Sequence, residues 1–366
     1  MTPLQSMATS AVAQGMAPGL VALVSRQGVS EEAVTGRLGH TSDSPMVRDA
    51  IFRIASVTKP IAAAATMLLI DDNRLHLDDP VAQWLPEIAS PMVVRTPYSE
   101  IDDLVPAQRP VTVEDLLTFR CGWGFGADFS LPAVQALFAE VFLYNKTAAQ
   151  IPTPDAWMAS LAKLPMLSQP GDQWLYNVGS DILGVLIARV SGQSLPDFLS
   201  ERLFQPLGMT ATGFTVAPEN TSRLAGSWRP NQTGTLDPIT EDPAQLAIMP
   251  RFPSAAGGLF STAQDLAAFF NMLLHGGLHG TRRLLTPESV RLMMTDHLNA
   301  EQRAASKLFL GWQGWGYGGS VDSFRTHPWN VPGRYGWVGG SGTAAHIIPA
   351  TGTISILLTQ VEMTGP

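Results

Sequence analysis

The chain of 366 residues contains a single cysteine, Cys121. An intrachain disulfide is therefore impossible, and packing must hold the fold together. Charged residues make up only 15% of the sequence against 45% hydrophobic residues, which argues against a disordered chain. The formal net charge is −8 and the sequence has no basic stripe, so we expect no nucleic-acid partner.

Signals for secretion and for membrane insertion are also lacking. The first 19 residues contain no lysine or arginine and no continuous apolar core, so we expect no secretory signal and, by default, a cytoplasmic protein. The charge-free run at 60–70 has 11 residues, which is too few to span a bilayer. We expect no membrane partner, and the sequence leaves the oligomeric state open.

Motifs for cofactors and metals occur only in weak form. Residues 314–319 fit the pattern G-x-G-x-x-G, but they neither end a parallel strand nor open an amphipathic helix. His275 and His279 have i, i+4 spacing, but two glycines between them would break a helix and no acidic third ligand accompanies them. We therefore expect no cofactor and no bound metal.

The most informative feature that is present is Ser56-Val57-Thr58-Lys59, followed by the charge-free run at 60–70. This run is apolar on all sides and rich in helix-forming residues, which predicts a helix buried inside a domain. Pro60 is tolerated only in the first turn, so the helix should begin close to Ser56 and place Ser56 and Lys59 on one face. A serine needs a positioned base, and a lysine can serve only if burial or a positive neighbour lowers its pKa.

The same spacing occurs a second time, at Ser160 and Lys163, within a short amphipathic stretch that ends at Pro165. No long apolar run follows it, so this copy predicts a surface turn. A serine can also act as a helix N-cap while a nearby lysine extends into solvent, so the spacing alone does not prove catalysis.

Apolar and turn patterns predict an α+β fold, an α/β sandwich with helices on an antiparallel sheet. Hairpin connections favour one sheet assembled from both ends of the chain. The strands are expected at 20–25, 32–36, 335–338, 343–348 and 353–359, and further helices at 113–118, 131–142, 180–191, 195–203 and 262–275. We expect a discontinuous domain, 1–75 with 255–366, that carries the sheet and the nucleophile helix, and a mostly helical inserted domain, 76–254.

A tyrosine supplies a candidate for the second proton-transfer group. Tyr176 lies in a polar, glycine-containing stretch just before a predicted helix, from which a side chain can project into a cleft. Ser56 to Lys59, the Tyr176 segment and Gly336-Trp337-Val338-Gly339-Gly340 together resemble the serine β-lactamase and penicillin-binding protein fold, and most closely its family VIII carboxylesterases. The similarity runs from about residue 20 to residue 359.

The resemblance implies that Ser56 forms an acyl-enzyme and that Lys59 and Tyr176 share the proton transfers, with the identity of the acylation base left open. It also implies an oxyanion hole formed by the backbone N–H groups of Ser56 and Gly340. Apolar residues that could line an acyl or alcohol pocket, together with the glycine beside them, are Trp337, Gly339, Trp123, Phe125 and Trp315.

Two departures from the β-lactamase pattern indicate the substrate class. Trp337-Val338-Gly339 aligns with the Lys-Thr-Gly motif, so an apolar ring replaces the cation that meets a substrate carboxylate. Val178 takes the place of the asparagine that contacts an acylamino group in class C β-lactamases. We therefore expect a carboxylesterase for small esters with short to medium acyl groups. A β-lactamase, a D-alanyl carboxypeptidase, an acyltransferase and a catalytically silent binding protein are the alternatives.

Overall fold

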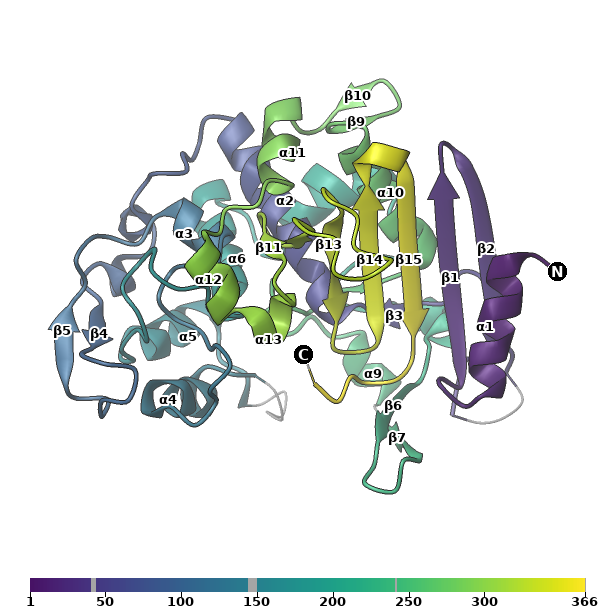
Figure 1. Cartoon of the computed structure of the whole chain (residues 1–366), viewed down its shortest axis with the longest axis horizontal. Coiled ribbons are helices and arrows are strands. Elements are labelled where there is room, and N and C mark those ends of the chain that lie inside the picture. Colours follow the sequence, from purple (N-terminus) through teal and green to yellow (C-terminus); the bar gives the residue numbers. More distant parts are fainter. Residues whose placement is uncertain (41–43, 144–149, 241, 366) are drawn as a thin grey trace.

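A seven-stranded antiparallel sheet combines both ends of the chain in the computed structural model, which describes residues 1–40, 44–143, 150–240 and 242–365 (Figure 1). The strand order is β11-β12-β13-β14-β15-β1-β2. The bounds are β1 Gly19–Arg26, β2 Val29–Gly36, β11 Gly314–Trp315, β12 Ser320–Val321, β13 Tyr335–Gly339, β14 Thr343–Ile348 and β15 Thr353–Thr359. Helices accompany this sheet, so the predicted α+β class is confirmed.

The β1–β2 hairpin closes through a two-residue turn, Gln27 and Gly28, whose φ angles are 50° and 83°. Two positive φ values are typical of the type I′ turn, whose twist suits a tight hairpin. Successive side chains of β1 point to opposite faces of the sheet, and each face packs against a different part of the structure. Leu20 packs on α1 (Pro3–Ala13) and Val21 belongs to the main core. Because both faces are covered, β1 reads as a continuous apolar run.

Helix α1 has no counterpart among the predicted elements. Thr2 caps its N-terminus and Pro3 occupies the first turn, a combination that is typical of helix starts and could have been found in the sequence. The expected helix at 195–203 is also divided, because α7 (Leu195–Leu199) passes into a π-helical turn at Ser200–Phe204.

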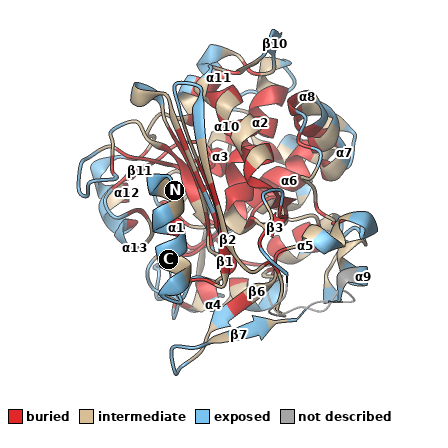
Figure 2. Ribbon diagram, turned by 90° about the vertical axis from the view of Figure 1, so that its right-hand side faces the viewer, coloured by how far each residue is buried: buried red, intermediate tan, exposed pale blue. Residues whose placement is uncertain are grey.

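The central helix is α2 (Thr58–Asp71), which is buried along nearly its whole length. It packs against α6 (Val178–Ser191), and both lie among the buried elements in Figure 2. The other helices are α3 Val113–Leu117, α4 Pro132–Glu140, α5 Pro154–Leu161, α8 Gln205–Leu207, α9 Pro243–Leu246, α10 Ala263–Leu274, α11 Pro287–Met293, α12 Ala300–Ala305 and α13 Lys307–Leu310. Helix α2 is thus the buried helix that was predicted after Ser56.

Short two-stranded ribbons connect these elements: β3 (Phe52–Arg53) with β8 (Phe260–Ser261), β4 (Met92–Val94) with β5 (Leu104–Pro106), β6 (Ser227–Pro230) with β7 (Leu236–Ile239), and β9 (Leu278–His279) with β10 (Arg282–Arg283). Most of the segment 76–254 is helix and loop lying beside the sheet (Figure 1). The division of the chain into two domains stays a prediction.

Within the described ranges, no single helix is both long enough and apolar enough to cross a membrane. Val178–Ser191 and Leu195–Leu207 reach the required length and composition only as a pair, and they are bent by 81° relative to each other.

Candidate active site

Ser56 lies in a single 3₁₀ turn, Ala55–Val57, that leads directly into α2. Ala55 has a φ of 45°, an uncommon value for a residue with a side chain. Strand β13 fits closely against this turn, since a Cβ atom on Gly339 would lie 2.3 Å from the Ile54 carbonyl oxygen. The Thr343 hydroxyl donates to the same carbonyl at 2.9 Å. The sheet therefore holds the turn that carries Ser56 in place, and a glycine is needed at position 339.

Lys59 follows one turn later and is 1% exposed. Its Nζ lies 2.7 Å from Ser56 Oγ and 2.6 Å from the Ala256 carbonyl oxygen. Burial lowers the pKa of the Lys59 ammonium, and Tyr176 and Asp181 oppose this shift. A buried lysine beside a serine hydroxyl has the two properties required of a general base, namely contact and a reduced cost of losing its proton.

Tyr176 lies just before α6 and is held through its backbone. Its N–H and C=O groups form a pair of hydrogen bonds with Phe125, at 2.9 and 2.8 Å. The tyrosine ring faces Lys59, whose Nζ is 4.6 Å from the ring centroid. Trp337 on β13 donates its indole N–H to Tyr176 Oη at 2.8 Å. Three segments distant in sequence thus meet around one serine.

Two backbone N–H groups are available for an oxyanion. Within the described residues, neither Ser56 N–H nor Gly340 N–H donates to a protein acceptor. Gly340 follows directly after β13, and Gly339 before it packs on the turn that carries Ser56. Free donors at the start of a helix suit a developing negative charge.

Three of the aromatic residues expected around the site lie in different places. Phe125 contacts Tyr176 edge to face, with 5.7 Å between ring centroids, and so does belong to the site. Trp315 is fully buried and packs on Trp337 at 4.8 Å, so it supports that ring from behind. Trp123 lies instead in the main core, because its indole N–H is satisfied by the Leu164 carbonyl at 3.1 Å.

Further aromatic rings around Tyr176 were not predicted. Phe309 on α13 stacks on the Tyr176 ring at 5.1 Å, and Trp174 stacks on it at 5.7 Å. Phe119 contacts the same ring at 5.8 Å. Trp174 lies two positions before Tyr176, whereas Phe119 and Phe309 come from other parts of the chain, and nothing in the local sequence marks Phe309 as a neighbour of Tyr176.

Two residues that support Lys59 were also missed. The Ala256 carbonyl accepts from Lys59, and Asp181 Oδ1 accepts from the Ala256 N–H at 3.0 Å. Asp181 is five positions after Tyr176, and Ala256 directly precedes Gly257-Gly258. For Asp181, its place in the segment that follows Tyr176 was the available signal in the sequence.

The single cysteine and the histidine pair have other roles. Cys121 is buried, and burial raises the pKa of its thiol to about 12, which is unsuitable for a nucleophile. His275 caps the end of α10, where its Nδ1 contacts the Asn271 carbonyl at 2.8 Å. Within the part of the chain that the structure describes, no group of three or more His, Cys, Asp or Glu side chains could hold a metal.

Comparison with known families agrees with this geometry. The Beta-lactamase family matches residues 4–365, which is nearly the whole chain. The chain belongs to the β-lactamase family. Members of this family and its structural neighbours include esterases, acyltransferases and carboxypeptidases, so the coarse assignment is a β-lactamase-fold serine hydrolase.

Individual relatives include both uncharacterised and named proteins. Protein Rv1367c of Mycobacterium tuberculosis (strain ATCC 25618 / H37Rv) is 38% identical over 326 residues, which cover 86% of this chain and 79% of that protein. Esterase EstB of Burkholderia gladioli is 29% identical over 262 residues, covering 68% and 63% of the two chains. The solved structure of EstCE1, a hydrolase with promiscuous acyltransferase activity, aligns with a TM-score of 0.81 at 24% identity, covering 99% and 93%.

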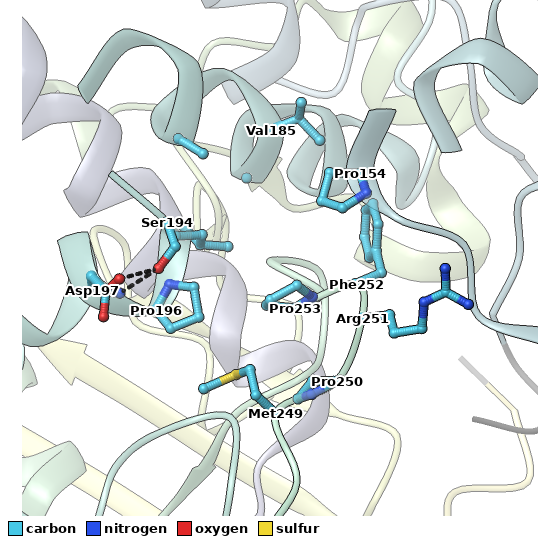
Figure 3. Close-up of a pocket in the computed structure, with 13 residues that line it drawn as sticks. Pro154, Val185, Ser194, Pro196, Asp197, Met249, Pro250, Arg251, Phe252 and Pro253 are labelled. Carbon is cyan, nitrogen blue, oxygen red and sulfur yellow. Dashed lines mark hydrogen bonds between the residues drawn. The ribbon is translucent and has the colours of Figure 1, made fainter. Parts of the chain in front are cut away.

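A separate apolar cavity of about 390 Å³ lies elsewhere in this β-lactamase-family chain, between α6, α7 and residues 249–253 (Figure 3). Ser194 and Asp197 at its edge bond to each other as the cap of α7. Its lining includes neither Ser56 nor Lys59, so it is distinct from the nucleophile site.

Proposed function

We propose that this β-lactamase-family protein is a serine carboxylesterase that hydrolyses short to medium acyl esters through an acyl-serine intermediate. The observation that carries the proposal is the contact between Lys59 Nζ and Ser56 Oγ at 2.7 Å, made by a buried amine whose pKa burial lowers. Esterase EstB and EstCE1 support the same reaction class through their similarity to this chain.

In the proposed reaction, Ser56 Oγ attacks the ester carbonyl carbon while its proton passes to Lys59 or Tyr176. The Ser56 and Gly340 N–H groups bind the oxyanion. The alcohol leaves with a proton from the same pair of residues, and water then hydrolyses the acyl-serine. Which residue takes the first proton stays open, because Lys59 and Tyr176 lie beside one another, with Nζ 4.6 Å from the ring centroid.

The surroundings of Tyr176 favour an uncharged, apolar substrate. Trp337 occupies the strand position of a substrate-binding cation and uses its N–H to contact Tyr176 Oη. Val178 is buried in the core and offers no amide group to an acylamino substrate. Phe125 and Phe309 add aromatic surface next to Tyr176, which suits an apolar acyl or alcohol group.

A graded ester panel tests the proposal. Purified protein is assayed with p-nitrophenyl esters of increasing acyl length, and the reaction is quenched for intact-mass analysis of the acyl-enzyme. We expect turnover of short and medium esters and an acyl adduct that maps to Ser56. Absence of any turnover and any adduct across the panel would overturn the assignment.

The same experiment separates the alternatives. Nitrocefin turnover or a penicilloyl adduct would identify a β-lactamase or a D-alanyl carboxypeptidase. Transfer of the acyl group to an added alcohol in preference to water would identify an acyltransferase. A Ser56 that never reacts with a fluorophosphonate probe would indicate a silent binding protein. Cytoplasmic residence and a small-molecule ester partner stay predictions from the sequence.

A further inference from the structure

The orientation of the Lys59 amine depends on a carbonyl group from a distant part of the chain. Lys59 Nζ donates to Ser56 Oγ and to the Ala256 oxygen, and Tyr176 adds a further polar contact to the amine. A carbonyl oxygen can accept a hydrogen bond but cannot take part in proton transfer. A neutral amine that donates one N–H to Ala256 is thereby turned so that its lone pair can face the Ser56 hydroxyl.

The Ala256 carbonyl belongs to a tight turn. The Ser254 carbonyl accepts from Gly258 N–H at 2.9 Å, which closes the turn. Gly257 lies against Ala55, since a Cβ built on it would be 3.6 Å from the Ala55 carbonyl carbon. The turn therefore contacts both the lysine and the residue that precedes Ser56, and any displacement of it would disturb both groups.

Asp181 fixes this turn from the side of α6. Its Oδ1 accepts from the Ser254 hydroxyl at 2.8 Å and from the Ala256 N–H at 3.0 Å. Gly184, one turn further along α6, approaches so closely that a Cβ there would lie 2.9 Å from Ala255 Cβ. The peptide group of Ala256 is thus held between a carboxylate on its N–H side and the Lys59 amine on its C=O side.

We propose that Asp181 is a positioning residue of the active site, whose carboxylate holds the Ala256 carbonyl in the place where it orients the Lys59 amine toward Ser56. This inference rests on the proposed acyl-serine chemistry. Asp181 does not touch Ser56, so its effect on the reaction passes through the Ala256 peptide group and through its charge.

The charge of Asp181 gives the proposal a distinctive signature. The titratable groups that face Lys59 are Tyr176, from the segment before α6, and Asp181 on α6, while the turn contributes only Ser254 and peptide groups and β13 the indole of Trp337. Burial lowers the pKa of Lys59, and the negative charge of Asp181 opposes that shift. Removing this charge should therefore lower the pKa of Lys59 further.

The test is the pH dependence of the rate at which a fluorophosphonate probe labels Ser56. In D181N we expect the plateau rate to fall by about tenfold or more, because misplacement of a reacting group is costly. We also expect the acid limb of the profile to move to lower pH. S254A keeps the carboxylate and removes one hydrogen bond, so its rate should fall less than that of D181N. Because burial raises the pKa of Asp181 and the Ser254 hydrogen bond opposes this, the shift of the acid limb is judged in D181N and not in S254A.

A matched control is D197N, which changes an aspartate that caps α7 through Ser194 and leaves the Asp181 network intact. It should label like the wild type. A D181N protein that labels at the wild-type rate with an unmoved acid limb would overturn the proposal. So would a slower rate with an unmoved limb and a lower melting temperature, which would show a structural role only.

Two further outcomes keep the inference separate from the proposed function. If the fluorophosphonate probe does not label the wild-type protein, the acyl-serine proposal is overturned, and the proposed role of Asp181 is overturned with it. If the wild type labels but D181N does not fold, S254A decides, and a wild-type rate in S254A would overturn the positioning role.

Discussion

Ser56 and Ser160 are each followed three residues later by a lysine, but the two lysines lie in opposite environments. Lys59 is 1% exposed and its Nζ contacts Ser56 Oγ. Ser160 lies near the end of α5, and Lys163 is exposed in the turn that follows. The predicted surface turn thus applies to Lys163, whereas Ser160 belongs to a helix.

The difference lies in what surrounds each pair. Helix α2 runs through the core and is covered on all sides, while α5 is buried on one face only. Burial makes a charged amine costly, so it favours the neutral form of Lys59, which is the form that a base requires. The two pairs share the same spacing in the sequence, but Lys163 lies in the exposed turn after α5, and only the buried environment marks Ser56 and Lys59 as a candidate catalytic pair.

The strongest way to test this comparison is to remove each serine in turn. We expect S56A to lower ester hydrolysis by about a thousandfold or more, because loss of a nucleophile removes the covalent route. S160A should hydrolyse esters at the wild-type rate. Initial rates with a chromogenic short-chain ester provide the measurement. Wild-type-like turnover in S56A would refute the assignment of Ser56.

Exchange of each lysine for arginine tests the role of the buried amine. An arginine keeps its proton at all accessible pH values, so K59R should lose about a hundredfold or more in kcat. K163R replaces one exposed positive charge with another, so its kcat should equal that of the wild type. Melting curves of both variants check that the fold survives. A K59R enzyme with near-normal kcat would exclude Lys59 as a required base.

The W337F variant tests the hydrogen bond from the Trp337 indole to Tyr176 Oη, a contact that belongs to the Ser56 site and not to Ser160. W337F keeps an aromatic ring but removes the N–H that donates to Tyr176 Oη, so we expect kcat to fall by about tenfold. The matched control is W157F, which removes an indole N–H bonded to the Val141 carbonyl in the core. W157F should lower stability and leave kcat unchanged. Equal kcat values in the two variants would contradict a role for the indole.

The mildest test changes no residue and follows the pH dependence of kcat/KM. Protonated Lys59 cannot act as a base, so activity should be lost as pH falls through its pKa. Because burial lowers that pKa from the ordinary lysine value of 10.5, the acid limb should lie below it. A limb at or above the ordinary value would argue against a buried lysine base.

Chemical modification compares the two lysines directly. Peptide mapping after acylation with an amine reagent should find Lys163 modified and Lys59 protected.

Much of the fold follows from local patterns. The expected strands at 343–348 and 353–359 match β14 and β15, and the helix at 262–275 differs from α10 (Ala263–Leu274) only at its ends. Turn glycines and apolar periodicity are properties of neighbouring residues, so the sequence expresses them directly. Helix α1 was missed although its N-cap was visible in the sequence.

The site was predictable to the extent that motifs carried it. Ser56, Lys59, Tyr176 and Trp337 all lie in motifs, and the structure brings them together. Trp123 was named as a residue that could line an acyl or alcohol pocket, and the structure places it in the main core, where its indole N–H donates to the Leu164 carbonyl. Phe309 and Asp181 had no pattern of their own. Their roles follow from contacts between distant segments.

The sequence by itself determined the spacing that brings Ser56 and Lys59 together, since residues three positions apart are neighbours in a 3₁₀ turn as well as in an α-helix. The resemblance to β-lactamases implies in addition that the Trp337 indole stands where those enzymes have a cation. The apolar run at 60–70 already predicted that this helix is buried. Only the tertiary structure decided which group receives the Lys59 amine, because the Ala256 carbonyl lies 197 positions away. The pKa of a buried group depends on every segment that surrounds it, and a local pattern does not name those segments.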